Sequence, residues 1–315
     1  MPIPTDYPFT RYLAAKKSID DRALNKDVWI TLKACLPKTT PERPLRVLEV
    51  GAGIGTMIER VLEWGLLSYA HYTAIDAEQG NLTFAHQRLD RWATARGYQT
   101  MHTDRGLCIR GANAELEVEL EAIDLFDYLT REKQHRPWDL LIAHAFLDLV
   151  DIPSALPGML STLRGDGLYY FTLNFDGLTS LEPEIDPALD RLIQELYHQT
   201  MDTRVINGQP SGDSRSGRHL FGHLPACGAS ILDAGASDWI IQPGSDGYLR
   251  DEAFFLHFII NTIHQALSGY PELDQALFES WISRRHAQVE RGELVYIAHQ
   301  LDFVGRPRMS RGKHE

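Results

Sequence analysis

The feature that most constrains this chain is a short apolar strand that runs into a glycine-rich turn and then into a helix. Leu45–Val50 is rich in branched apolar residues, the turn reads Gly51-Ala-Gly-Ile-Gly55, and Thr56–Trp64 carries apolar residues at helical spacing. Because glycine has no Cβ, it adopts positive φ without strain and lets a main chain approach a ligand closely. The unit therefore predicts a strand and a helix joined by a ligand-binding turn, with an ordinary turn that binds nothing as the alternative.

The alternation of strand and helix continues along the first half of the chain. A second strand, His71–Ala77, is followed by a helix at Asn81–Arg96, and Trp138–His144 is a continuous apolar strand of the kind buried on both faces. Glu115–Ile123 alternates charged and apolar residues, like a strand at the edge side of a sheet. Two further elements are a helix at Pro153–Arg164 and a strand at Gly167–Leu173. The alternation predicts an α/β fold, a mostly parallel sheet with helices on both faces.

The rhythm changes after Gly177, where helices dominate. The expected elements are a helix at Asp186–Met201, a loop at Asn207–Gly217, a helix at His219–Pro225, a strand at Ser230–Pro243, helices at Arg250–Leu267 and Pro271–Arg291, and a last strand at Glu293–Phe303. Residues 1–40 are also expected to be helical. These helical additions fall where they would roof the carboxyl edge of the sheet, and open α/β sheets hold their ligands at that edge.

Charge and composition exclude several classes of function. The net charge of −12 repels polyanions such as DNA and RNA. The only basic cluster consists of Arg306, Arg308, Arg311 and Lys313 in a short tail. No apolar run is long enough to cross a bilayer, and the first residues lack the basic start and apolar core of a signal peptide. The three cysteines are far apart without a CxxC pair, so neither disulfides nor a metal site is expected. We therefore expect a cytoplasmic protein without nucleic-acid or membrane partners.

The residues around the turn discriminate between ligands. A dinucleotide fingerprint requires glycine at the sixth position of G-x-G-x-x-G, but this chain has Thr56 there. The strand also ends with an acid, Glu49, and a carboxylate at that place would repel a pyrophosphate and attract a cation. The segment Glu49-Val-Gly-Ala-Gly-Ile-Gly55 resembles the first motif of class I S-adenosylmethionine-dependent methyltransferases. The resemblance covers roughly Leu45–Leu173 and the last two strands, and it implies a Rossmann-like sheet of seven strands, mostly parallel with the last antiparallel.

The resemblance also implies a cofactor, S-adenosyl-L-methionine, with S-adenosyl-L-homocysteine as its product. In the family the glycine loop lies beneath the methionine part, the acid that ends strand two binds both ribose hydroxyls, and the acid that ends strand three lies near the adenine amino group. Carried over to this chain, the cofactor-binding residues are Glu49, Gly51, Ala52, Gly53, Gly55, Asp76, Ala77, Asp124, Leu125 and His144. For Asp76 a cap on the following helix is the alternative. Asp127 is the alternative to Asp124.

Residues just past the strand ends are the candidates for contact with the acceptor. Methyl transfer from a sulfonium is an in-line displacement in which positioning and exclusion of water matter most, and a general base is needed only when the acceptor must lose a proton. We predict catalytic roles for His144, Asp148 and His219, and a hydrogen-bonded histidine that supports the sheet edge is the alternative for His144. Lys16, like the other cations of the N-terminal helices, is expected to face solvent rather than to bind the carboxylate of the cofactor.

These observations together predict a methyltransferase that acts on a small-molecule acceptor, with the accepting atom and the oligomeric state left open. The alternatives are a non-catalytic module that binds S-adenosylmethionine and a nicotinamide-dependent oxidoreductase. The expected segments are residues 1–40 as an N-terminal helical cap, 41–177 as the cofactor-binding core, 178–217 as a helical and loop insert that serves as a substrate lid, and 218–315 as the completion of the sheet with two further helices.

Overall fold

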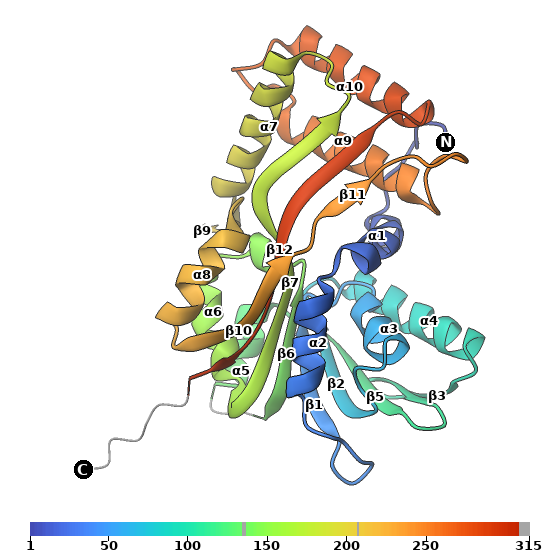
Figure 1. Cartoon of the computed structure of the whole chain (residues 1–315), viewed down its shortest axis with the longest axis vertical. Coiled ribbons are helices and arrows are strands. Elements are labelled where there is room, and N and C mark those ends of the chain that lie inside the picture. The colour runs from blue at the N-terminus through green and yellow to red at the C-terminus, as the bar shows by residue number, and fades with distance from the viewer. Residues whose placement is uncertain (134–136, 207, 309–315) are drawn as a thin grey trace.

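The computed structural model describes residues 1–133, 137–206 and 208–308, so Arg311 and Lys313 of the basic tail lie outside the described residues. Within these residues one ten-stranded sheet has the order β10-β12-β7-β6-β1-β2-β5-β4-β3, with β11 paired to β12 (Figure 1). Its strands are β1 (Leu45–Val50), β2 (Tyr69–Asp76), β3 (Gln99–Thr103), β4 (Gly106–Arg110), β5 (Glu115–Ala122), β6 (Trp138–His144), β7 (Leu163–Glu182), β10 (Ala229–Ala236), β11 (Trp239–Ile241) and β12 (Val295–Pro307). A separate small hairpin joins β8 (Val205–Ile206) and β9 (Gln209–Pro210).

The directions of the strands confirm the predicted fold class. Five neighbouring strands, β5, β2, β1, β6 and β7, run parallel, and β12 is antiparallel to both β7 and β10. The sheet is larger than predicted because the sequence pattern missed the hairpin of β3 and β4, which pairs with β5. The expectation that β5 lies at the edge side of the sheet was therefore wrong. Its alternation arises because Glu117 and Glu119 face solvent on one side of an interior strand.

Helices cover both faces of the parallel strands. Side chains of α2, α3 and α4 form one apolar core against the sheet, and those of α5, α6 and α8 form another on the opposite face. β1 serves both cores, because Val47 belongs to the first and Leu48 to the second. No helix within the described residues is long and apolar enough to cross a membrane. The helices are α1 (Phe9–Ala23), α2 (Lys26–Cys35), α3 (Thr56–Glu63), α4 (Gln79–Ala95), α5 (Leu125–Arg131), the 3-10 helix η1 (Leu147–Leu149), α6 (Ile152–Ser161), α7 (Pro187–Asp202), α8 (Ser216–Ala226), α9 (Glu252–Leu267) and α10 (Gln275–Glu290).

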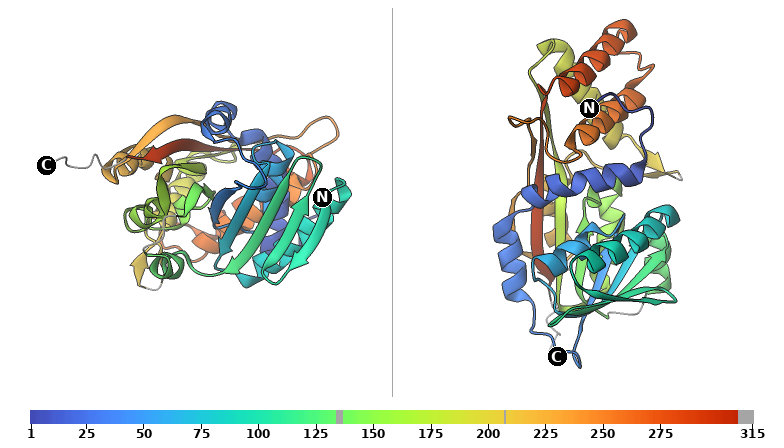
Figure 2. Two further views of the ribbon diagram at one scale, coloured as in Figure 1. Left: turned by 90° about the horizontal axis from the view of Figure 1, so that it is seen from below. Right: turned by 90° about the vertical axis from the view of Figure 1, so that its right-hand side faces the viewer.

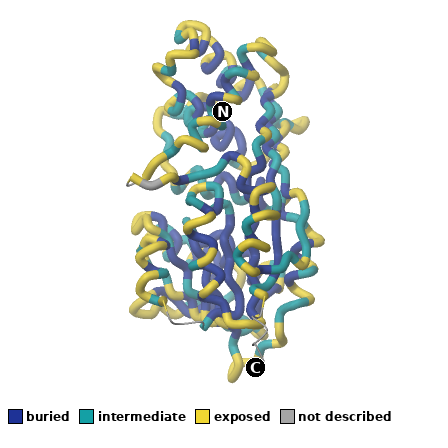
Figure 3. The backbone as a smooth tube through the Cα atoms, turned by 90° about the vertical axis from the view of Figure 1, so that its left-hand side faces the viewer, coloured by how far each residue is buried: buried dark blue, intermediate teal, exposed yellow. Residues whose placement is uncertain are grey.

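Two strands continue beyond the carboxyl edge of the sheet and carry a second level of helices. The fifth predicted strand, Gly167–Leu173, is the middle of β7, which runs on to Glu182. β7 pairs with β12 with register shifts between Ala298 and Gln300 and between Leu301 and Phe303. On these extensions lie α7, α9 and α10, which we call the upper helical unit (Figure 1). Its apolar core is distinct from the two cores of the sheet. Buried backbone is present in both levels, and exposed backbone lies on their outer sides (Figure 3).

The N-terminal helix lies between the two levels. Figure 2 shows α1 running across the carboxyl edge of the sheet, below the upper helical unit. Its Ala15 and Ile19 belong to the core of that unit. α1 and α2 confirm that residues 1–40 are mainly helical, and α1 lies where a roof over the sheet edge was expected.

Candidate functional site

The glycine turn follows β1 at the point where the order of the sheet reverses. β1 lies between β2 and β6, and open α/β sheets hold ligands in the crevice at such a point. Gly51, Gly53 and Gly55 have φ values of 65°, 55° and 76°. These positive values strain any residue with a Cβ, so the backbone of the turn requires glycine. The main-chain N–H of Ala52 donates to the oxygen of Ile75 at 3.0 Å and fixes the turn against β2.

Asp76 ends β2 and is hydrogen-bonded directly to the turn. Its Oδ2 accepts from the N–H of Gly53 at 2.8 Å, and its Oδ1 accepts from the N–H of Glu78 at 2.9 Å and from Nδ2 of Asn81 at 3.2 Å. The carboxylate therefore orders both the turn and the start of α4, so the capping alternative is part of its role. A carboxylate offers about four acceptor positions, and three are used here. Asp76 is half-buried, so one side of it faces solvent.

Two apolar side chains lie on the turn. The ring of Phe146 is so close to Gly51 that a Cβ there would overlap it, and Cδ1 of Leu13 is 3.3 Å from the position of a Cβ on Gly53. The chain turns sharply before Phe146 because Ala145 has a φ of 51°, in the left-handed region that residues with a Cβ rarely adopt. A ligand that contacts the main chain of the turn must therefore displace these two side chains.

Glu49 lies beside the turn but is held inside the protein. It is 1% exposed, and its Oε2 accepts from the hydroxyl of Tyr72 at 2.7 Å. Burial raises the pKa of Glu49 to about 8, so its carboxyl is mostly neutral at neutral pH. Burial thus acts against the charge on which the predicted repulsion of pyrophosphate and attraction of a cation depend. The backbone of the turn and the carboxylate of Asp76 remain as the features that select a ligand.

A buried ion-pair network joins α1 to the sheet next to the turn. The partners of the Asp20 carboxylate are Nζ of Lys16 at 2.6 Å, Nη2 of Arg60 at 3.3 Å, Nε2 of His144 at 3.1 Å and Nε1 of Trp239 at 2.9 Å. Burial alone raises the pKa of Asp20, but the charge of Lys16, together with His144 and Arg60, outweighs it and lowers the pKa below its ordinary value. Lys16 is 6% exposed, so its predicted place on a solvated face was wrong.

His144 ends β6 inside this network. Its Nε2 lies 3.0 Å from Nη1 of Arg60, and its Nδ1 lies 2.8 Å from Oγ1 of Thr172. Burial, followed by the charge of Arg60, lowers the pKa of His144 to about 3, so the ring is neutral. Both ring nitrogens have partners. This geometry favours the alternative role, a histidine that supports the edge of the sheet, over a general base.

The other two predicted catalytic residues lie in different places. Asp148 is in η1, two residues after Phe146, and its Oδ1 is buried without a hydrogen-bond partner within the described part of the chain. Burial raises the pKa of Asp148. His219 is exposed on α8, where its Nδ1 lies 2.6 Å from Oδ2 of Asp213, and it lines a surface pocket of about 440 Å³ that includes no residue of the turn. Asp148 therefore lies two residues from a side chain that contacts the turn, whereas His219 lines a pocket that contains no residue of the turn.

The remaining cofactor candidates lie along the same edge of the sheet. Asp124 caps α5, because its Oδ1 accepts from the N–H of Phe126 at 2.7 Å. Leu125 is buried in the core beneath α5, and Ala77 is exposed directly after Asp76. The ends of β2 and β5 are joined by a bond from the N–H of Ile123 to the oxygen of Asp76, so these residues border the Asp76 end of the turn.

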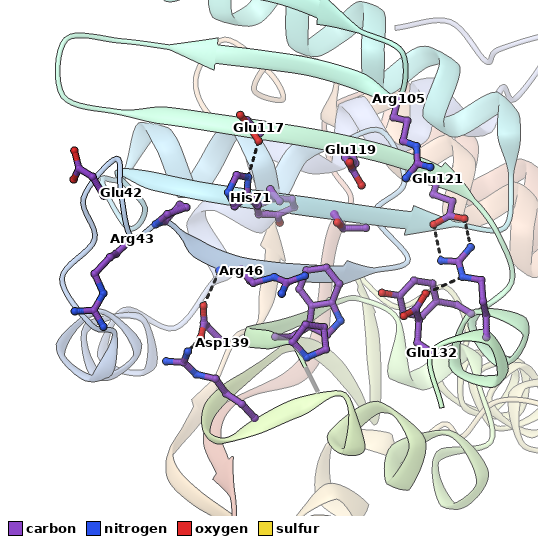
Figure 4. Close-up of a pocket in the computed structure, with 18 residues that line it drawn as sticks. Glu42, Arg43, Arg46, His71, Arg105, Glu117, Glu119, Glu121, Glu132 and Asp139 are labelled. Atoms are coloured by element: carbon purple, nitrogen blue, oxygen red, sulfur yellow. Dashed lines mark hydrogen bonds and ion pairs between the residues drawn. The ribbon is translucent and has the colours of Figure 1, made fainter. Parts of the chain in front are cut away.

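A separate open groove of about 960 Å³ lies on one face of the sheet (Figure 4). It is lined mainly by charged side chains from β1, β2, β5, β6 and their connections. Several of these pair with one another, such as His71 with Glu117 at 2.6 Å and Arg131 with Glu121. None of the predicted site residues lines this groove, so it is distinct from the turn and Asp76.

The chain matches no protein family model and no curated protein sequence. The comparison with solved structures returns methyltransferases, the class named by the resemblance in sequence, and also a [4+2]-cyclase. The identities of these structures to this chain are 14% or lower and the TM-scores are 0.46 or lower, so the likeness does not identify the activity of this chain.

Three of these structures illustrate the range. One is an S-adenosylmethionine-dependent methyltransferase from Thiobacillus denitrificans in complex with S-adenosyl-L-homocysteine, which is 14% identical, with 98% of this chain and 100% of that chain covered and a TM-score of 0.46. The second is phosphoethanolamine N-methyltransferase 2 from Haemonchus contortus, at 12% identity, 97% and 61% coverage and a TM-score of 0.44. The third is the cyclase SpnF, at 13% identity, 98% and 99% coverage and a TM-score of 0.43.

Proposed function

We propose that this chain is an S-adenosylmethionine-dependent methyltransferase that acts on a small-molecule acceptor. The observation that carries the proposal is the hydrogen bond between the glycine turn and Asp76, which joins a main chain without side chains to a carboxylate on the neighbouring strand. One ribose hydroxyl can take the acceptor position that the protein leaves free on Asp76, and the adjacent hydroxyl requires the bond to Gly53 or to Asn81 to give way. The reversal point of a parallel sheet is also where a nucleoside ligand is expected.

The turn and the strand ends fit S-adenosylmethionine. The backbone of the turn has the shape to approach it closely, and the acids at the strand ends offer oxygens for its hydroxyl and amino groups. When bound, S-adenosylmethionine supplies a methyl group on a positively charged sulfur. Asp76 then binds the ribose hydroxyls, Gly51 and Gly53 allow the methionine part to approach the main chain, and Asp124 with Leu125 borders the adenine. The remaining candidates support this surface from below and from the side; they are Glu49, Ala52, Gly55, Ala77 and His144. α1 and the upper helical unit exclude water from the place of transfer.

We expect Asp76→Ala to weaken the binding of S-adenosylhomocysteine by about 2 to 3 kcal/mol, because a charged hydrogen-bond partner of the ribose is removed. This corresponds to a dissociation constant about 30 to 150 times larger, which isothermal titration calorimetry measures directly. An unchanged dissociation constant contradicts the ribose role.

Two matched variants separate this role from the structural one. Asn81→Ala removes one of the bonds that Asp76 makes to α4 and leaves the carboxylate in place, so we expect nearly normal binding. Asp246→Ala removes an exposed carboxylate from a turn far along the chain and is expected to bind normally. If Asn81→Ala binds as weakly as Asp76→Ala, the effect arises from the start of α4. A parallel titration with NAD tests the oxidoreductase alternative.

A non-catalytic module is the second candidate, and one observation favours it. Phe146 and Leu13 occupy the surface of the turn that a ligand would contact. A protein that had lost the cofactor as well as the activity would have no need to expose this surface, unlike a module that still binds S-adenosylmethionine. A methyltransferase requires both side chains to move aside when the cofactor binds.

We therefore expect Phe146→Ala to strengthen the binding of S-adenosylhomocysteine by about fivefold. Displacing a half-buried ring opposes binding by about 1 kcal/mol, and the variant removes that opposition. Stopped-flow fluorescence would show whether the gain is in the association rate. Phe221→Ala, at an exposed ring on α8, is the control. Weaker binding by Phe146→Ala would contradict a displaced ring and would indicate that Phe146 contacts the ligand.

A further inference from the structure

Three tyrosines and one carboxylate come together between the sheet and the upper helical unit. We call them the tyrosine cluster: Tyr12 of α1, Tyr197 of α7, Tyr296 of β12 and Asp148 of η1. Packing places them together. Tyr12, Tyr197 and Ala145, which lies three residues before Asp148, pack against the same apolar core as Tyr296, and Arg204, just after α7, donates to the main-chain oxygen of Asp148. Burial is the main cause that raises the pKa of Tyr12, followed by the charge of Asp20, with a smaller contribution from Asp148. Burial and then Asp148 raise the pKa of Tyr197 to about 12, and burial followed by Tyr197 raises the pKa of Tyr296.

The carboxylate of this cluster has an oxygen without a partner. Oδ1 of Asp148 is buried and accepts no hydrogen bond within the described residues. Two cations lie near it, but Nζ of Lys16 is bound to Asp20 at 2.6 Å, and Nη2 of Arg204 donates to the main-chain oxygen of Asp148 at 3.1 Å. A buried acceptor without a donor destabilises the protein by about 1 to 3 kcal/mol. A ligand with an N–H group would supply the missing donor.

The rings of the cluster are held in place by the surrounding protein. The ring of Tyr12 stacks on Phe258 with 4.1 Å between centroids and on Phe255 at 5.5 Å. The hydroxyl of Tyr296 is hydrogen-bonded to the side chain of Thr179. Aromatic faces carry partial negative charge and attract cations, the more so where water is excluded. The face of Tyr12 that stacks on Phe258 is not open to a ligand, so the unpaired carboxylate oxygen of Asp148 is the group that favours a positively charged ligand.

The cluster is adjacent in the chain to the contacts on the glycine turn. Tyr12 precedes Leu13, which lies on Gly53, and Asp148 follows two residues after Phe146, which lies on Gly51. The same two segments thus contact the turn and carry the cluster. A ligand bound at the cluster would lie next to a cofactor bound at the turn.

We propose that the tyrosine cluster binds the methyl acceptor and that this acceptor is an amine, held through its nitrogen at Oδ1 of Asp148. The inference rests on the proposed function, because it names the substrate class of the same site. A protonated amine supplies both an N–H donor and a positive charge, whereas a carboxylate or phosphate acceptor would be repelled by Asp148. Methylation leaves the product nitrogen positively charged, so the rings contact a cation before and after transfer.

The carboxylate of Asp148, the amine and the cofactor account for every bond and proton in the transfer. One N–H proton of the ammonium passes to the carboxylate of Asp148 and leaves a lone pair on nitrogen. The nitrogen forms a bond to the methyl carbon while the bond from that carbon to sulfur breaks, and the electron pair remains on sulfur. The products are a methylated ammonium, S-adenosylhomocysteine and a protonated Asp148 that returns its proton to water. The raised pKa of Asp148 suits a proton acceptor.

Three probes of one shape and different charge test the proposal. The full-length protein, with S-adenosylhomocysteine present, is titrated with 3,3-dimethylbutylamine, 3,3-dimethylbutan-1-ol and 3,3-dimethylbutanoate, and binding is followed by calorimetry and saturation-transfer NMR. We expect the amine to bind at least about ten times more tightly than the alcohol or the acid, as one charge-assisted hydrogen bond provides. Equal binding of amine and alcohol, or no saturable binding of the amine, overturns the proposal.

Variants assign the preference to the cluster. Asp148→Asn keeps the shape and removes the charge, so it should abolish the preference for the amine without lowering the melting temperature, because the lost oxygen had no partner. Asp246→Asn is the matched control. Tyr197→Phe keeps the ring and should retain the preference, whereas Tyr197→Leu should reduce it. An amine preference that persists in Asp148→Asn overturns the assignment.

The outcomes also separate this inference from the proposed function. If S-adenosylhomocysteine binds but the amine shows no preference over the alcohol, the acceptor class is wrong and the methyltransferase remains. If S-adenosylhomocysteine does not bind, the proposed function fails. The amine titration without it then still reports on the tyrosine cluster.

Discussion

Gly53→Val should abolish measurable binding of S-adenosylhomocysteine, with a dissociation constant raised about 100-fold or more, and its effect should exceed that of Asp76→Ala. The branched side chain would project from the turn to where the ligand must lie, and a Cβ there is already 3.3 Å from Leu13. The φ of 55° at this position adds backbone strain. Isothermal titration calorimetry of the folded variant measures the loss.

Gly97→Val is the matched control for this prediction. Gly97 has a φ of 80°, so valine there is strained in a similar way, but a Cβ on Gly97 meets no atom within 4 Å. We expect this variant to lose stability and to keep its affinity for the ligand. Gly53→Ala, which adds a single methyl group, should fall between the wild type and Gly53→Val. Normal affinity in Gly53→Val would mean that the ligand binds elsewhere.

The second large effect is expected for Arg60→Met. Arg60 is fully buried, and its guanidinium contacts Asp20, Asp21 and His144. Removal of one member of a buried ion pair leaves the other charge uncompensated, which lowers the free energy of unfolding by about 3 to 5 kcal/mol. For a chain of this length we expect the melting temperature to fall by about 5 to 8 °C in calorimetry.

Two further variants test this explanation. Arg91→Met removes an exposed guanidinium of α4 that donates to the main-chain oxygen of Gln87, and it should leave the melting temperature nearly unchanged. The double variant Arg60→Met with Asp20→Asn should be no more stable than Arg60→Met, because the substitution of Asp20 also removes the carboxylate that pairs with the buried Lys16 at 2.6 Å. A melting temperature for Arg60→Met equal to that of the wild type would show that the network contributes no stability.

The parts of the fold that depend on short-range patterns were predictable from the sequence. The strand Leu45–Val50, the glycine turn and the acid at position 76 were located because branched apolar residues, glycine and a terminal acid are local signals. The order of strands along the chain followed in the same way, whereas the antiparallel last strand was implied by the resemblance to the methyltransferases. The sequence pattern did not reveal the hairpin of β3 and β4, because four of the five residues of β3 are exposed and its apolar and polar residues do not alternate.

The contents of the site were harder to predict because they depend on contacts between distant segments. Nothing local indicates that Leu13 of α1 and Phe146 after β6 both meet the turn, or that Lys16 is buried against Asp20. Arg60 gave no local signal either. The structure shows that residues 56–62 of its helix are all buried, so this cation requires a carboxylate from another element. Asp20 and Asp21 supply it.

The course of β7 and β12 through both levels limits how the molecule can admit its ligands. Both strands continue from the sheet into the upper helical unit, and they pair on both sides of register shifts between Ala298 and Gln300 and between Leu301 and Phe303. Separation of the two levels would have to break pairs on both sides of these shifts. We therefore expect ligands to exchange by movement of α1 and of the segment after β6, while the two levels stay together.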